Sequence, residues 1–201
     1  MATHTQFEPE TATDPIALFR HWFDEAAQTE PNDPNAMALA TSTAAGHPSV
    51  RMVLMKRLDE RGFSFYTNVE SQKGHELTEN PHAALCFHWK SRRRQVRVEG
   101  SVQELSPADA DAYFHSRSRQ SQIGALASQQ SRPLDSREEL ERLAKEYAER
   151  YPGEVPRPSY WRGFVLVPNR IEFWEDGAFR LHNRVVFVRA DAAWERTRLF
   201  P

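Results

Sequence analysis

Two cations bound one apolar run of this chain, and a third follows shortly after. Arg51 and Lys56 flank Met-Val-Leu-Met, and Ser71 and Lys73 open a helical pattern downstream. A strand rises about 3.3 Å per residue, which places Arg51 and Lys56 roughly 17 Å apart. That spacing suits two anions or one long ligand, and the helix start adds N–H groups that favour an anion. Solvated cations at the strand ends of a simple hairpin are the alternative, and these residues alone leave it open.

Two further groups of polar side chains could line a site. Tyr113 and Arg117 are four residues apart on an expected helix, and Ser121 follows, a combination that suits a phosphate. Arg180, His182 and Arg184 alternate on an expected strand and would share one face, which suits an anionic or electron-rich ligand. A surface Tyr/Arg pair and an exposed strand face remain the alternatives for these two groups.

Composition limits the class of protein. The chain has 201 residues, a net charge of −2 and one cysteine, Cys86. We expect a single domain over 14–201, a flexible arm over 1–13, a reducing cytoplasmic location and no affinity for nucleic acid or membrane. Cys86 and His88 share a strand face without a second pair, so no metal site is predicted. The basic run 92–94 is expected to be a solvated loop.

The expected elements make a mainly β protein with peripheral helices, an α+β fold. Strands are expected over 36–43, 51–56, 63–67, 83–89 and 95–102, and again over 163–167, 170–174, 180–189 and 193–198. Helices are expected after the caps Asp14, Ser106 and Ser136, and from about residue 70 until Pro81. Residues 118–134 are expected to form a long polar loop, which in a small domain is usually functional or mobile.

Nine short motifs, taken together, resemble the pyridoxamine 5′-phosphate oxidase family. In chain order they are RMVLMK at 51–56, FYTN at 65–68, SQKG at 71–74, QVRVEG at 95–100, YFHSRSRQSQIGALAS at 113–128, QQS at 129–131, EVPRPSYW at 154–161, IEFW at 171–174 and RLHNR at 180–184. Each motif is weak alone, but nine in the family's order over residues 14–201 are specific.

The resemblance implies an FMN-binding split β-barrel that forms a homodimer with FMN at the subunit interface. It implies an FMN set consisting of Arg51, Met52, Val53, Leu54, Met55, Lys56, Tyr66, Thr67, Gln72, Lys73, Gln95, Gln130, Ser131, Trp174 and Arg184. The implied substrate set is Lys56, Tyr113, Arg117, Ser121, Arg180 and His182, with Arg180 and His182 as the catalytic pair against the substrate ring.

The implied reaction is an FMN-dependent oxidation in vitamin B6 metabolism. Pyridoxamine 5′-phosphate or pyridoxine 5′-phosphate would become pyridoxal 5′-phosphate, with O₂ as acceptor and H₂O₂ released, and ammonia from the amine. No strong acid/base pair is visible in the sequence. Two alternatives stay open: a split-barrel flavin or deazaflavin reductase with another substrate, and a non-enzymatic module that binds flavin or pyridoxal phosphate.

The chain departs from the family pattern at several positions. Gln72 stands where Arg is usual, Asn183 follows His182 where Asp is usual, and Leu-Phe-Pro at 199–201 replaces Leu-Ala-Pro. An Arg-Arg-x-Tyr segment common near the family's N-terminus is absent. We expect these departures to affect affinity and rate more than the type of reaction.

Overall fold

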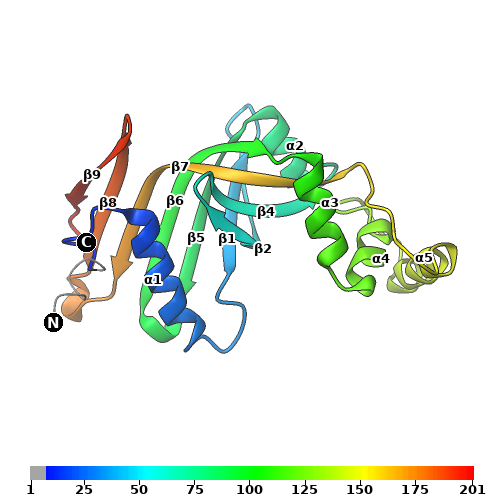
Figure 1. The fold of residues 1–201 in the computed structure, drawn as a ribbon, viewed down its shortest axis with the longest axis horizontal. Helices are drawn as coiled ribbons and strands as arrows, with labels where there is room; N and C mark the ends of the chain where they lie inside the picture. Colours follow the sequence, from blue (N-terminus) through cyan, green and yellow to red (C-terminus); the bar gives the residue numbers. More distant parts are fainter. Residues whose placement is uncertain (1–7) are drawn as a thin grey trace.

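The computed structural model describes residues 8–201, which form a curled antiparallel sheet with helices at its edges (Figure 1). Within this range the strands are β1 (Ala36–Ser42), β2 (Pro48–Leu54), β3 (Arg57–Asp59), β4 (Gly62–Asn68), β5 (His82–Trp89), β6 (Arg94–Glu104), β7 (Trp161–Glu175), β8 (Asn183–Ala190) and β9 (Ala193–Arg198). The helices are α1 (Pro15–Ala27), α2 (Gln72–Glu79), α3 (Pro107–Ser116), α4 (Arg119–Ala127) and α5 (Arg137–Arg150). The predicted mainly β fold with peripheral helices is confirmed.

The sheet curls because its two ends are tied together. Its strands run in the order β2-β1-β5-β6-β7-β4-β3, with β8 and β9 added beside β7. Just after β2, the Lys56 N–H donates to the Ser64 carbonyl of β4 over 2.8 Å. This contact brings the first strand of the order against the far end of the sheet. The result is a half-barrel that is joined at this contact, and a cavity opens between the rest of β2 and β4.

One long strand replaces two predicted ones. β7 runs unbroken from Trp161 to Glu175, whereas the sequence predicts strands over 163–167 and 170–174. Pro168 lies between the two predicted strands and cannot donate a ladder hydrogen bond. The structure accommodates it beside Gly100, where the register of β6 against β7 shifts at a bulge. A bulge is one of the few places in a sheet interior that tolerates proline.

Helix α1 covers one face of the sheet and builds the main core. Asp14 accepts hydrogen bonds from the N–H groups of Ile16 and Ala17, so the predicted cap is confirmed. The Phe19 ring meets Phe63 and Phe87, each at 4.9 Å between centroids. Edge-to-face contacts of this kind add to the burial of large apolar side chains. The opposite face of β1, β5 and β6 carries half-exposed residues such as Ala38, Cys86 and Arg97.

A second, smaller core lies under α3, α4 and α5, at the other end of the molecule from β8 and β9 (Figure 1). The predicted polar loop over 118–134 is wrong for 119–127, which form α4. Ser118 caps this helix by accepting from the Ser121 N–H, and Ile123 and Ala127 bury one face. The four polar residues at 119–122, before Ile123, hid the helical spacing.

Residues 8–13 differ from the flexible arm predicted for 1–13, of which residues 1–7 lie outside the described residues. Ala12 is buried, and Arg196 donates to its carbonyl over 2.7 Å. Asn183 donates to the Glu10 carboxylate. The segment therefore packs beside β8 and β9. No helix within 8–201 is long and apolar enough to cross a membrane.

Candidate active site

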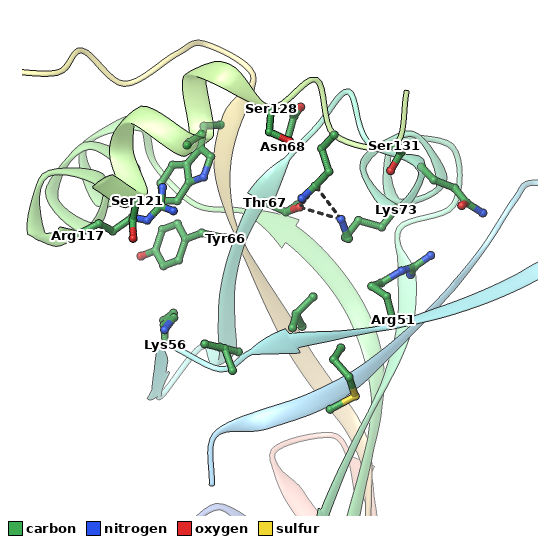
Figure 2. A pocket seen from close by; sticks show the side chains of 18 of the residues that line it. Arg51, Lys56, Tyr66, Thr67, Asn68, Lys73, Arg117, Ser121, Ser128 and Ser131 are labelled. Carbon is green, nitrogen blue, oxygen red and sulfur yellow. Dashed lines mark hydrogen bonds between the residues drawn. The ribbon is translucent and has the colours of Figure 1, made fainter. Parts of the chain in front are cut away.

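A cavity of about 980 Å³ opens between β2, β4, α2 and α4. This volume is at the upper end of the range for small-molecule sites and leaves room for a large ligand or two smaller ones. Most of the residues implied by the motifs line it: Arg51, Met52, Val53, Leu54, Lys56, Tyr66, Thr67, Gln72, Lys73, Tyr113, Arg117, Ser121, Gln130 and Ser131. Figure 2 shows Lys56, Arg117 and Ser121 at one end and Arg51, Lys73 and Ser131 at the other.

At the first end, Lys73 lies in a cage of uncharged oxygens. Its Nζ donates to Gln130 Oε1 over 2.8 Å and to Thr67 Oγ1 over 3.3 Å (Figure 2). It also donates to Ser71 Oγ over 3.2 Å. Burial, aided by the nearby Arg51 charge, lowers the pKa of Lys73 to about 8, against the opposing effect of Glu76. A bound anion would restore the charged form, because an opposite charge favours it.

Arg51 is held at this end by a buried carboxylate. Its guanidinium lies 3.3 Å from Glu76 and also donates to Ser49 and Thr41. Burial alone would raise the pKa of Glu76, but hydrogen bonds from Ser49, Thr41, Gln72 and Arg51 lower it to about 2. Glu76 is therefore charged at neutral pH and offsets one of the two cations beside it.

At the other end, Arg117 is held by rings rather than by a carboxylate. Its guanidinium lies over Trp161 at 5.1 Å and Phe114 at 5.7 Å from the ring centroids. Its Nη1 atom is buried without a hydrogen-bond partner. Lys56 Nζ lies 5.9 Å from the Tyr113 centroid. Because a buried unpaired donor is costly, this end is suited to a ligand that accepts hydrogen bonds.

Three stacked rings form the wall between β4 and α3. Tyr66 lies 4.1 Å from Tyr113 and 5.3 Å from Trp161, with nearly parallel planes. Gly163 makes the close approach of Tyr66 possible, because a Cβ there would lie 2.6 Å from the tyrosine ring. The stack fixes Tyr113 and provides the face on which Arg117 rests.

The floor of the cavity is β2, an end strand of the sheet. It pairs with β1 on one side. Its other edge faces the cavity, so alternate backbone N–H and C=O groups from Val50 to Leu54 are free for a ligand. The Val50 and Met52 side chains are 67% and 65% exposed, which is unusual for large apolar groups. Met55, in contrast, points into the core and does not line the cavity.

The remaining predicted residues lie outside the cavity, on a strip across β6, β7 and β8. Gln95 pairs with Trp174 in register, and Trp174 pairs with Arg184. The His182 ring contacts Trp174 at 4.7 Å between centroids. Four of the predicted residues thus come together, but away from the cavity of the same chain.

The predicted strand over 180–189 begins only at Asn183, so Arg180, His182 and Arg184 do not share a strand face. Arg180 lies in a short 3₁₀ turn (Ala178–Arg180) with φ at +68°, next to Phe179 at +57°. Left-handed backbone is uncommon for residues other than glycine. Gly177 permits this turn, because a Cβ there would meet the Leu181 carbonyl at 2.0 Å.

Two residues of the strip, Arg184 and His182, each contact a carboxylate. Arg184 donates from Nε and Nη2 to Glu172 Oε1 at 2.9 and 2.8 Å. Glu172 is 1% exposed and also pairs with Arg97 and Arg170. Burial would raise the pKa of Glu172, but hydrogen bonds from these arginines lower it. His182 lies beside Asp176, which the sequence had not singled out.

Known proteins identify the family. A sequence family described as "Pyridoxamine 5′-phosphate oxidase" matches residues 23–151, and a "Pyridoxine 5′-phosphate oxidase C-terminal dimerisation region" matches residues 161–201. A protein from Rhodospirillum rubrum named pyridoxine/pyridoxamine 5′-phosphate oxidase is 61% identical over 194 residues, covering 94% of this chain and 96% of that one. The chain belongs to the pyridoxine/pyridoxamine 5′-phosphate oxidase family.

Two solved structures share the fold. PhzG from Burkholderia lata 383, in complex with tetrahydrophenazine-1-carboxylic acid, is 32% identical with a TM-score of 0.90, covering 98% of this chain and 96% of that one. An FMN binding protein from Nostoc punctiforme PCC 73102, described as pyridoxamine 5′-phosphate oxidase-related, is 17% identical with a TM-score of 0.77, covering 94% and 100%. The family is one of flavin-dependent oxidoreductases, so membership also indicates a flavin cofactor and a dimer.

Several residues of the oxidase cavity were missed by sequence reasoning. Ser49, Asn68, Ser128 and Trp161 all line it. Trp161 ends the EVPRPSYW motif, which supported the family resemblance but assigned Trp161 no role. Asn68 ends the FYTN motif and Ser49 precedes RMVLMK, but nothing in their spacing indicates a ligand. The Gly124 and Ala125 backbone lines the cavity only because α4 is a helix.

Proposed function

We propose that the protein is an FMN-dependent oxidase that converts pyridoxamine 5′-phosphate and pyridoxine 5′-phosphate to pyridoxal 5′-phosphate. The observation that carries the proposal is one cavity with two cationic ends. Arg51 and Lys73 provide one, and Lys56 and Arg117 provide the other. A phosphorylated cofactor and a phosphorylated substrate, placed together, require such a pair of sites.

The first end would hold the FMN phosphate. Lys73 donates only to uncharged groups, so its charge is available to a phosphate. Gln130 and Ser131 border the same end, and the free edge of β2 would run beside the flavin ring. Backbone N–H and C=O groups on an open strand edge can pair with the polar edge of such a ring.

The second end would hold the substrate phosphate. Lys56, Tyr113, Arg117 and Ser121 offer an ammonium, a phenol, a guanidinium and a hydroxyl around it. The buried, unpaired Nη1 of Arg117 supports this assignment, because a phosphate oxygen would supply the missing acceptor. Placing the phosphate there would hold the substrate ring in the middle of the cavity, beside the stacked aromatic wall.

The strip at Gln95, Trp174, Arg180, His182 and Arg184 would complete the site of a second copy. Four of these five residues belong to the segment that matches the family's dimerisation region. The exposed Val50 and Met52 side chains border the cavity and would be covered by such a partner. We infer a homodimer in which each site takes its cavity from one subunit and its strip from the other.

In the reaction, FMN would supply the two-electron oxidation, and its reoxidation by O₂ would yield H₂O₂. The chain's own residues would bind, orient and exclude water. Arg180 and His182 of the partner's strip would press the substrate ring into place, because reaction requires close and aligned approach. Release of ammonia from the amine substrate, and a cytoplasmic location, belong to this proposal.

The likeness to PhzG supports a second candidate, oxidation of a reduced tricyclic carboxylic acid. Such a substrate lacks a phosphate and would leave the Lys56–Arg117 end without its dianion.

Purified protein is first examined for a flavin spectrum, and the released cofactor is identified as FMN. H₂O₂ production is then measured with pyridoxamine 5′-phosphate, pyridoxine 5′-phosphate, unphosphorylated pyridoxamine and tetrahydrophenazine-1-carboxylic acid. Oxidation of the two phosphates, with unphosphorylated pyridoxamine much slower, is the expected result. Turnover of the tricyclic acid alone would overturn the proposal, and turnover only with a reduced nicotinamide or deazaflavin would indicate a reductase.

A further inference from the structure

A carboxylate and an imidazole meet in the loop between β7 and β8. Asp176 Oδ1 lies 2.9 Å from His182 Nδ1, with 24% and 16% of the two side chains exposed. The Asp176 N–H donates to the Arg93 carbonyl over 3.0 Å, and the Arg93 guanidinium binds the Asp176 carboxylate. Trp174 contacts the imidazole at 4.7 Å between centroids. Asp176 is thus fixed from behind and aimed at one ring nitrogen.

The surroundings of Nδ1 select one protonation pattern. The Gly177 N–H also points at Nδ1, over 3.2 Å, and would suit a ring that carries its proton on Nε2. That tautomer would place the Nδ1 lone pair against the Asp176 carboxylate, which is unfavourable at 2.9 Å. A proton on Nδ1 instead donates to the carboxylate. The shorter, charge-assisted contact is the stronger one, so Nε2 is left as the acceptor.

The charges around the ring support the same pattern. The nearest are Asp176 at 2.9 Å, Arg93 behind it and Arg180 two residues before the histidine. The hydrogen bond from Arg93, followed by the proximity of His182, lowers the pKa of Asp176. The carboxylate is therefore ionised throughout the neutral range.

Asp176 supplies the carboxylate that contacts His182, whereas the residue directly after the histidine is Asn183. The family pattern places an Asp directly after the RLH motif, but this chain has Asn183. The Asn183 amide donates to the Glu10 carboxylate. The carboxylate that faces His182 comes from the end of β7 instead.

We propose that Asp176 is the positioning residue of His182, holding its proton on Nδ1 so that Nε2 accepts a hydrogen bond from the substrate. The inference rests on the proposed function, which puts His182 against the substrate ring. It adds to that function an acid/base pair that the sequence did not reveal. Donors of the right kind on the substrate are the ring hydroxyl and the amine or alcohol at the reacting carbon.

The protonation pattern is tested first, without any reaction. In ¹⁵N-labelled protein, long-range ¹H–¹⁵N spectra report which imidazole nitrogen carries the proton, and the His182 signals are assigned by their absence in His182→Gln. We expect the Nδ1–H form in the parent and a shift toward Nε2–H in Asp176→Asn. Glu175→Gln is the matched control, since Glu175 pairs with Arg94 and not with the histidine. An unchanged His182 signal in Asp176→Asn, or an equal change in Glu175→Gln, would overturn the proposal.

Kinetics then separate positioning from mere support of the fold. In flavin-loaded Asp176→Asn we expect kcat/KM to fall about tenfold, while FMN affinity changes less than about twofold. Asp176→Glu should restore part of the rate. A fall in melting temperature without a change in the His182 tautomer would assign Asp176 a structural role only. If the parent fails to oxidise either phosphate, the proposed function fails, while the spectra still decide whether the pair exists.

Discussion

Two arginines of the proposed site are held in place by different means. Arg117 lies on the faces of Trp161 and Phe114 and has no carboxylate partner among its described contacts. Arg184 donates twice to the buried Glu172, which it shares with Arg97 and Arg170. Ring stacking leaves the charge of Arg117 available to a ligand. Pairing with Glu172 makes Arg184 a fixed donor whose charge is partly offset.

The difference corresponds to two kinds of ligand. A phosphate dianion gains most from an uncompensated cation, and a flavin or pyridine ring gains most from an aligned donor. The two arginines also lie far apart in the fold. Arg184 is in β8 at one end of the sheet, and Arg117 follows α3 at the other (Figure 1). One chain therefore offers two half-sites, and the comparison predicts that they combine between subunits.

The largest expected effect comes from mixing two inactive proteins. Arg117→Ala damages the cavity and Arg180→Ala damages the strip, so each homodimer should keep at most about a tenth of the parent kcat/KM. In a hybrid dimer, one site pairs the intact cavity with the intact strip. Random exchange makes half of the dimers hybrid, so activity should return to roughly a quarter of the parent value.

The exchange is measured by refolding or prolonged incubation of the two variants together, with H₂O₂ release as the readout. A mixture of Arg117→Ala with Lys56→Ala is the control, because both changes damage the same half-site and no hybrid contains an intact site. Recovery in the control as well, or no recovery in the test mixture, would contradict shared sites.

The second effect distinguishes Arg117, which stacks on aromatic rings, from Arg184, which pairs with Glu172. Arg117→Ala should raise KM for the phosphorylated substrate by roughly 10- to 150-fold, because a charge-assisted hydrogen bond is worth about 1.5–3 kcal/mol. FMN affinity should hardly change. Arg184→Ala should show the reverse, with weaker FMN binding first. Steady-state kinetics and FMN titration on both variants provide the measurements, and the same profile in both would remove the distinction between the two regions.

Residue types and local patterns predicted most of the helices and strands, but not the tertiary contacts between them. Asp14, Ser71, Ser106 and Ser136 cap the helices that follow them, as their residue types indicated. Helix α4 was missed because its first four residues, 119–122, are polar, and β7 was predicted as two strands although a bulge accommodates Pro168. Each error came from tertiary contacts that outweigh a local preference.

The candidate site shows the same limit. Lys73 and Gln130 are 57 residues apart in sequence, and no spacing rule joins them. Their grouping was available only through resemblance to the family. Trp161 and Asp176 were not predicted at all, because each acts by holding another side chain. The strained turn at Phe179 and Arg180 replaced a predicted strand, since alternation of residue types cannot report a left-handed backbone.

The third effect is a pH dependence confined to the FMN end. Lys73 has a pKa of about 8 in the free protein, so it is charged below that pH and loses its proton above it. A bound phosphate would raise this pKa, so FMN binding should take up a proton above pH 8. The FMN dissociation constant should then rise as pH increases from about 8, by at most about tenfold per pH unit.

FMN titrations followed by flavin fluorescence between pH 6.5 and about 9.5 would test this linkage. Lys73→Gln should bind more weakly and lose the pH dependence, since it retains a polar group without a titratable charge. A parent dissociation constant that stays flat across this range would show that Lys73 does not contact the phosphate. The substrate KM reports on the Arg117 end and should not follow the Lys73 titration.

The smallest effect concerns Gln72, where the family usually has Arg. The Gln72 side chain is exposed and donates to Glu76 Oε1 over 3.0 Å, so an arginine there would meet the same carboxylate that holds Arg51. It would compensate the Glu76 charge and leave Arg51 and Lys73 more attractive to a phosphate. An exposed added charge contributes about 0–1 kcal/mol, so Gln72→Arg should tighten FMN binding by less than about fivefold.

Gln72→Met removes the hydrogen bond without adding charge and should give no gain. The gain should also shrink with added salt, because the new charge is solvent-screened. Weaker FMN binding in Gln72→Arg, measured by titration at low ionic strength, would mean that the phosphate does not lie near the start of α2.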